Sequence, residues 1–343
     1  TYFNDEKYKD AEGAYADVIT NYPKSPFYKK ARVQMALVYV NTDQDEKALE
    51  ADKDLVKDFP NSPEATESLL GIRNLYIDKG DANGFLGYLK TQPGLSLSAS
   101  NEDSLLYEAA ENNFNIQKYN AAIEGVSTYV DKYPKGYFIP NALFVRAESY
   151  VKQSEWGKAF TDFTAIANMS PNDYTERSVQ KAAYIAYVHL KDYPQALNYY
   201  QLMAERSGYK KNKAEGILGA MRSAYKLEKN EICAKYAQTV STDETYSTVD
   251  QNEAHFYLGK MAFNANDTLT AEKEFSACLK NNKGEQAAEA RFCLAKIKYM
   301  KGNYQRAEDA CYDIINEFPT YERWIGETLL LLADVYTAEK EYI

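Results

Sequence analysis

Five of the ten prolines in this chain fall on one lattice with a spacing of 37 residues. They are Pro23, Pro60, Pro134, Pro171 and Pro319, and every gap between them is a whole multiple of 37 residues. A chain of 343 residues is longer than the size at which a single hydrophobic core stops growing. A fixed period in such a chain predicts stacked copies of one small unit, each of which buries its apolar face only against its neighbours.

Small and aromatic residues keep the same period. A small residue precedes each lattice proline by twelve positions, at Ala11, Ala48, Ala122, Ala159 and Ala307. Tyrosines lie nine positions before this small-residue phase, at Tyr2, Tyr39, Tyr76, Tyr150 and Tyr187, and the series resumes one residue late at Tyr225, Tyr299 and Tyr336. Apolar residues recur at helical spacings of three and four, and proline ends the second helix of each unit because it has no backbone donor. The pattern predicts an all-α fold of eight two-helix units, preceded by a second helix and followed by a first helix.

The order small, aromatic, small, aromatic, proline resembles the tetratricopeptide repeat, whose pattern reads W-x2-L-G-x2-Y…A-x3-F…P. Ala36, Tyr39, Ala48, Leu55 and Pro60 fill five of its places in one unit. The period is 37 residues rather than about 34, and the extra residues lie in the turn after the proline. The resemblance covers the whole chain and implies a right-handed α-solenoid that binds proteins and catalyses nothing.

The turns after the second helices carry a further resemblance. Segments 22–26 and 59–63 share an aromatic-Pro-x-Ser-Pro sequence. It is similar to repeats of bacterial envelope lipoproteins, notably the outer-membrane barrel-assembly lipoprotein and the Tol–Pal system coordinator, and to tyrosine-rich repeat proteins of Bacteroidetes-type bacteria. That similarity implies a periplasmic or outer-membrane-associated protein, with the cytoplasm left open. No apolar run approaches the roughly 18 residues of a membrane span.

We expect residues 1–343 to form a single solenoid whose weakest stretch is 77–104. Four glycines accumulate there, and Phe85 takes the place of a small residue, so the second helix should be short. This stretch is a hinge between 1–95 and 101–343, a loop presented to a partner, or a degenerate repeat with relaxed packing. Both ends of the chain cut through a helix pair and lack the polar caps that solenoids need, so we expect the natural protein to continue in both directions.

Catalytic and cofactor chemistry is not indicated. A formal charge of -10 argues against nucleic acid, which calls for clustered Lys and Arg. Neither His189 nor His255 belongs to a discernible catalytic grouping, and no glycine-rich phosphate loop is present. We therefore predict no enzyme activity, no cofactor and no metal. The four cysteines are interpreted as structural thiols, with a Cys293–Cys311 disulfide as the alternative in an oxidising compartment.

The predicted binding surface is the concave face, which is lined by the first helices. Positions six and two residues before the tyrosine phase give Val33, Leu37, Leu70, Asn74, Tyr107, Glu111, Phe144, Glu148, Lys181 and Ile185. Tyr107, Glu111, Phe144 and Glu148, with Lys181 beside them, form a stripe suited to a partner segment with apolar and basic side chains. The alternative is that these residues pack against each other.

The sequence thus favours a protein–protein interaction scaffold with an unidentified protein partner. Glycan or polysaccharide binding through exposed tyrosines is one alternative function. A regulatory repeat array within a larger protein is another.

Overall fold

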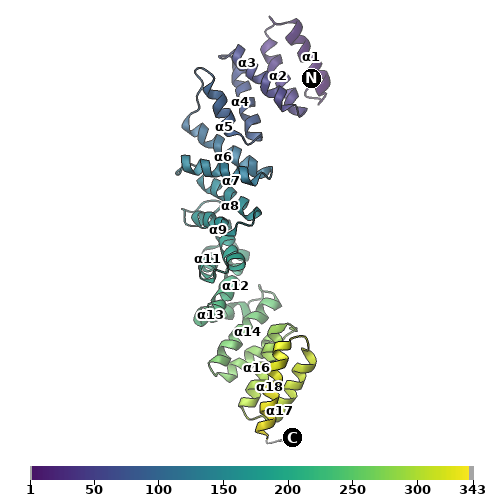
Figure 1. The fold of residues 1–343 in the computed structure, drawn as a ribbon, viewed down its shortest axis with the longest axis vertical. Coiled ribbons are helices and arrows are strands. Elements are labelled where there is room, and N and C mark those ends of the chain that lie inside the picture. Colours follow the sequence, from purple (N-terminus) through teal and green to yellow (C-terminus); the bar gives the residue numbers. More distant parts are fainter. Residues whose placement is uncertain (1, 340–343) are drawn as a thin grey trace. The chain divides into compact units, whose positions relative to one another are not determined.

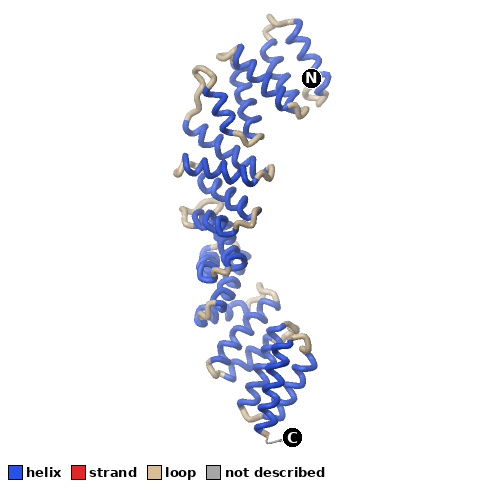
Figure 2. The backbone as a smooth tube through the Cα atoms, viewed as in Figure 1, coloured by secondary structure: helices blue, strands red, loops and turns tan. Residues whose placement is uncertain are grey.

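The computed structural model describes residues 2–339, and in that part of the chain all regular structure is helical (Figures 1 and 2). Contacts group the chain into two compact units, Thr1–Asn168 and Met169–Ile343, called unit 1 and unit 2 below. Their boundary falls after α9, away from 77–104. The hinge predicted there remains a prediction.

Unit 1 begins with one second helix and continues with four helix pairs. The first helix of each pair is given before the second: α1 (Tyr8–Asn21); α2 (Tyr28–Asn41) and α3 (Asp45–Asp58); α4 (Pro63–Asp78) and α5 (Ala82–Lys90); α6 (Ala99–Asn115) and α7 (Tyr119–Lys132); α8 (Ile139–Lys152) and α9 (Trp156–Ala167). At nine residues α5 is the shortest α-helix in the described part of the chain, as its glycines predict.

As far as residue 339, unit 2 holds four further pairs and then the first helix α18. They are α10 (Thr175–Ile185), extended by the π-helical turn η1 (Ala186–Leu190), and α11 (Tyr193–Arg206); α12 (Lys210–Lys226) and α13 (Asn230–Thr242); α14 (Thr248–Asn264) and α15 (Thr268–Cys278); α16 (Glu285–Met300) and α17 (Tyr304–Glu317); and α18 (Glu322–Ala338). The predicted all-α order of eight pairs with a flanking helix on each side is confirmed.

The backbone conformation of the turns repeats with the same period. Each of the eight turns between paired helices, and also the turn before α1, contains one residue with a left-handed φ of 53° to 73°. These residues are Glu6 before α1, and then Asp43, Gly80, Gln117, Ser154, Lys191, Glu228, Asn266 and Gly302. The first seven follow one another at intervals of 37 residues, and the last two at 38 and 36. The late tyrosine at 225 is therefore no backbone insertion. The turn keeps its register at Glu228, and the aromatic residue has moved by one position along α12.

The alanine phase forms the contact between paired helices. Ala48, Ala122, Ala159 and Ala307 are fully buried, and Ala11 is 2% exposed. A small side chain at this position lets the paired helices approach closely, and aromatic residues fill the space beside it, as in the Tyr299–Tyr304 contact near Ala307, with ring centroids 5.7 Å apart. The predicted role of the alanine phase is confirmed by this burial.

A buried carboxyl lies between α3 and α4. Asp52 is 5% exposed, and its Oδ1 accepts a 2.6 Å hydrogen bond from the Ser68 hydroxyl. Burial raises the pKa of Asp52 to about 6, although the Ser68 bond opposes the change. Because the folded state holds this proton more tightly than the unfolded state, the associated stability is complete below about pH 4 and is lost as the pH rises through about 6.

Asp52→Asn should remove this pH dependence. Relative to the parent, the variant should gain about 2 kcal/mol of unfolding free energy between pH 4 and pH 7, because the parent alone must hold a buried carboxylate at neutral pH. Urea unfolding at several pH values measures the difference. Asp54→Asn on the exposed side of the same helix is the control, and equal pH profiles for the two variants would contradict the prediction.

Candidate functional site

The first helices of unit 1 form a continuous layer, because α2, α4, α6 and α8 each contact the next along the chain. The predicted inner positions of this layer fall into two rows. Val33, Leu70, Tyr107 and Phe144 form one row with a spacing of 37 residues, and Leu37, Asn74, Glu111 and Glu148 form the other. The second row is half-buried or exposed at all four positions, and we call it the accessible row.

The other row lies mostly inside the protein. Val33, Tyr107 and Phe144 are 3%, 5% and 6% exposed, whereas Leu70 is 58% exposed. The Tyr107 ring stacks on Phe138 with centroids 4.7 Å apart and an interplanar angle of 5°. Phe144 meets Phe163 edge-on at 5.6 Å. The predicted exposure of Val33, Tyr107 and Phe144 is therefore wrong. Loop and second-helix aromatics pack against Tyr107 and Phe144.

Burial gives Tyr107 a positioning role. Its hydroxyl donates a 2.5 Å hydrogen bond to Oε1 of Glu111, one turn later on α6, and so fixes a carboxylate of the accessible row. Beside it, Arg73 of α4 donates a 2.8 Å hydrogen bond to Glu108 of α6. The partner-binding role of Tyr107, Glu111, Phe144, Glu148 and Lys181 stays a prediction.

The two remaining positions belong to unit 2. Lys181 is half-buried on α10, and Ile185 is 1% exposed. Ile185 therefore joins the core, contrary to the exposed place expected for it.

The first helices of unit 2 are joined by polar contacts that the repeat pattern does not predict. Arg222 of α12 donates to Glu253 of α14 at 2.6 Å and to Asp250 at 2.9 Å, and Lys260 donates to Glu289 of α16 at 2.6 Å. Gln180 reaches Glu215 in the same way, at 2.7 Å. The signal for these links was a glutamate near the start of three successive first helices, at 215, 253 and 289.

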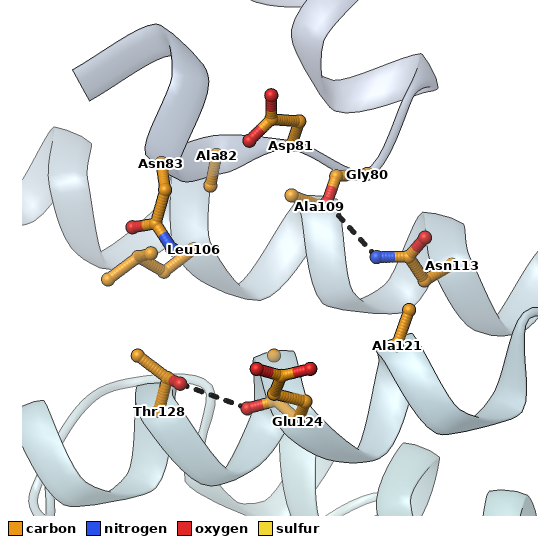
Figure 3. A pocket seen from close by; sticks show the side chains of 11 residues that line it. Gly80, Asp81, Ala82, Asn83, Leu106, Ala109, Asn113, Ala121, Glu124 and Thr128 are labelled. Carbon is orange, nitrogen blue, oxygen red and sulfur yellow. Dashed lines mark hydrogen bonds between the residues drawn. The ribbon is translucent and has the colours of Figure 1, made fainter. Parts of the chain in front are cut away.

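A hollow of about 210 Å³ opens in unit 1 between the α4–α5 turn, α6 and α7 (Figure 3). Its lining residues are Gly80, Asp81, Ala82, Asn83, Leu106, Ala109, Asn113, Ala121, Glu124, Gly125 and Thr128. We call it the Asn113 hollow. A shallower hollow of about 440 Å³ lies at the loop after α7 and includes Tyr133 and Tyr137, the latter 84% exposed. Glycan binding by such rings stays a prediction.

The four cysteine thiols are buried in the core, and His255 is paired with a glutamate of the neighbouring helix. Burial raises the pKa of the Cys233 and Cys278 thiols to about 12 and of the Cys293 and Cys311 thiols to about 11, and all four are free and buried. Nδ1 of His255 lies 2.7 Å from Glu274 of the paired helix. Within residues 2–339 no group of three or more His, Cys, Asp or Glu side chains is arranged to hold a metal ion. In the same part of the chain, no helix has the length and apolar character needed to cross a bilayer.

Comparison with known proteins agrees with this architecture. Two segments, residues 30–62 and 258–322, match family models described as tetratricopeptide repeats. Both segments are similar to tetratricopeptide repeats. Proteins built from such repeats are, as a class, protein-interaction scaffolds that bind partners on extended curved surfaces.

Solved tetratricopeptide-type structures resemble the chain at low identity. PilW, a type IV pilus biogenesis factor, is 17% identical over 69% of this chain and 100% of its own, with a TM-score of 0.38. The pilF protein of Pseudomonas aeruginosa is 14% identical over 66% and 95%, with a TM-score of 0.33. Cut9–Hcn1, from the APC/C, is 13% identical over 95% and 59%, with a TM-score of 0.38. Similarities at this level say nothing about what the chain binds. No curated protein matches the sequence.

Proposed function

We propose that this chain is a non-catalytic protein-interaction scaffold of a bacterial cell envelope, and that the first-helix layer of unit 1 binds a segment of a partner protein. The accessible row carries this proposal. It places one reachable side chain on each of four successive first helices that contact one another, at intervals of 37 residues. A regular row on a stiff layer suits an extended or helical segment that makes one contact per repeat.

The two ends of the layer differ in chemistry, so a bound partner segment should run in one defined direction along it. At the α2–α4 end, Leu37 of the row and the exposed Leu70 of the neighbouring row add apolar surface beside the polar Asn74. Glu111 and Glu148 make the α6–α8 end acidic. A complementary segment carries apolar side chains at one end and lysines or arginines at the other. Tyr107 holds Glu111 in place before the partner arrives, which lowers the entropy that is lost on binding.

The envelope location rests on the turn sequences. The aromatic-Pro-x-Ser-Pro segments that resemble envelope repeat proteins lie at the surface, with Tyr22 58% exposed and Phe27, directly after the first segment, 67% exposed. Immunoblotting of fractionated source cells tests this part independently of partner binding.

Site-specific cross-linking in the source cell tests the binding surface. A photoreactive residue in place of Asn74 should capture a protein that the same residue in place of Glu50, an exposed position of the second helix α3, does not capture. With the captured protein purified, Glu111→Gln combined with Glu148→Gln should weaken binding about tenfold through loss of two charged contacts. Glu50→Gln combined with Asp54→Asn should leave the affinity unchanged. Equal capture at both positions, or unchanged affinity in the first double variant, would reject the proposed surface.

A further inference from the structure

The Asn113 hollow lies where this repeat departs from the tyrosine pattern of its neighbours. At Tyr39, Tyr76 and Tyr150 the tyrosine lies four residues before the left-handed position of the turn. The same phase in α6 holds Asn113. One repeat earlier, the Tyr76 ring lies so close to Gly84 that a Cβ at that glycine would be 2.6 Å from it. Ala121 is the counterpart of Gly84, so the hollow beside Ala121 is the space that the tyrosine ring leaves empty.

A lysine is also missing from this repeat. The counterparts of Ala121 two repeats before and one repeat after are Lys47 and Lys158. Lys47 Nζ lies 5.6 Å from the centroid of the Tyr39 ring, and Lys158 Nζ lies 5.3 Å from that of Tyr150. In those two repeats a long cationic side chain covers the place that is open beside Ala121. The α6–α7 repeat therefore has neither a ring at 113 nor a cation at 121, and its aromatic residue is the next one, Phe114, whose ring centroid lies 5.8 Å from that of Tyr119.

The lining has the polarity that suits a cation with an apolar stem. Leu106, Ala109 and Ala121 supply apolar surface, and none of the eleven lining residues is a lysine or arginine. Asp81 and Glu124 bring exposed carboxylates, and Glu124 takes part in none of the ion pairs found within residues 2–339. Asn113 is 5% exposed, and its Nδ2 donates a 3.1 Å hydrogen bond to the Gly80 carbonyl, as Figure 3 shows. This bond leaves the side-chain carbonyl of Asn113 available as an acceptor.

We propose that the Asn113 hollow binds one lysine or arginine side chain of a partner polypeptide. The stem of that side chain lies on Leu106, Ala109 and Ala121, and its cation meets Glu124 and Asp81 at the rim. The volume of about 210 Å³ admits one long side chain. This contact goes beyond the proposed function, because the hollow is built from α5, α6 and α7 rather than from the accessible row.

Single amino-acid amides probe the hollow without knowledge of the partner. The probes are the N-acetyl N-methylamides of lysine, arginine and norleucine, and the readout is the ¹³C-methyl signals of Ala109 and Ala121 in the full chain. The lysine and arginine amides should shift these signals in a saturable way, and the norleucine amide, which has a similar stem and no charge, should not. Glu124→Gln should weaken the binding about threefold, as expected for a partly exposed charge pair.

Two variants complete the test. Asn113→Tyr restores the lattice residue and should weaken lysine-amide binding at least tenfold while the far-ultraviolet circular dichroism spectrum stays unchanged. Glu50→Gln, at the position equivalent to Glu124 in the repeat that Tyr39 and Lys47 fill, should change nothing. Equal shifts with the norleucine amide, undiminished binding in folded Asn113→Tyr, or no shift at either alanine would overturn the proposal. None of these results bears on the accessible row, which the partner-binding assay tests alone.

Discussion

Replacing Gly216 with valine should destabilise unit 2 by about 3 kcal/mol, the upper part of the range for overpacking a close helix contact. Gly216 is buried where α12 crosses α11. A Cβ at this position would lie 2.5 Å from the backbone nitrogen of Ala204 and 2.9 Å from the carbonyl oxygen of Tyr200. Both obstacles are backbone atoms, so no rotamer change relieves the contact and the helices must separate.

Hydrogen exchange followed by mass spectrometry measures this effect locally. Amides of α11 and α12 should exchange about a hundredfold faster in Gly216→Val than in the parent, which is the kinetic equivalent of the expected loss. Gly326→Val is the matched control, because Gly326 is also helical and in unit 2 but has no atom within 4 Å of its Cβ position. That variant should be neutral or slightly stabilised, since valine has the higher helix propensity. Similar exchange rates in the two variants would show that the close contact at Gly216 carries no strain.

The architecture could be predicted because the same constraint recurs several times along the sequence. Alanine at the helix contact, tyrosine beside it and a terminating proline recur in register, so single departures such as Phe85 did not obscure the pattern. The burial of Ala48, Ala122 and Ala159 and the 37-residue spacing of the left-handed turns follow from that repetition.

The surface could not be predicted in the same way. Position within a repeat says which face of a helix a residue occupies, but not what a neighbouring segment places over it. Tyr107 and Phe144 share a phase with the exposed Leu70, but they are buried, and the rings of Phe138 and Phe163 pack against them. These covering rings come from a loop and from a second helix, which the counting of first-helix positions leaves out.

The Asn113 hollow could be predicted in part from the sequence. The missing tyrosine at 113 is visible in the sequence as a gap between Tyr76 and Tyr150. Its consequence is not visible there, because an asparagine could have been covered by a larger residue on the paired helix. The structure shows that Ala121 does not cover it.

Arg146→Met should destabilise unit 1 by about 3 kcal/mol. Arg146 of α8 donates two hydrogen bonds to Asp162 of α9, at 2.7 and 2.8 Å, and a third to Ser127 of α7 at 3.1 Å. Asp162 is only 5% exposed. Hydrogen bonding to Asp162 raises the pKa of Arg146 above its ordinary value, so the guanidinium stays charged at any working pH. Methionine keeps much of the stem but leaves a buried carboxylate without its cation, which is costly in a poorly solvated site.

Two further variants separate loss of the pair from loss of packing. Combining Arg146→Met with Asp162→Leu removes both charges and should recover most of the lost stability, because a buried ion pair and an apolar pair of similar volume are often nearly equivalent. Arg32→Met breaks the 2.7 Å pair with Asp58, which is 50% exposed, and should lose under about 1 kcal/mol. Urea unfolding monitored by circular dichroism gives all three values. If the double variant is no more stable than Arg146→Met alone, the arginine acts through its packing, and the three helices α7, α8 and α9 are held together by its stem rather than by its charge.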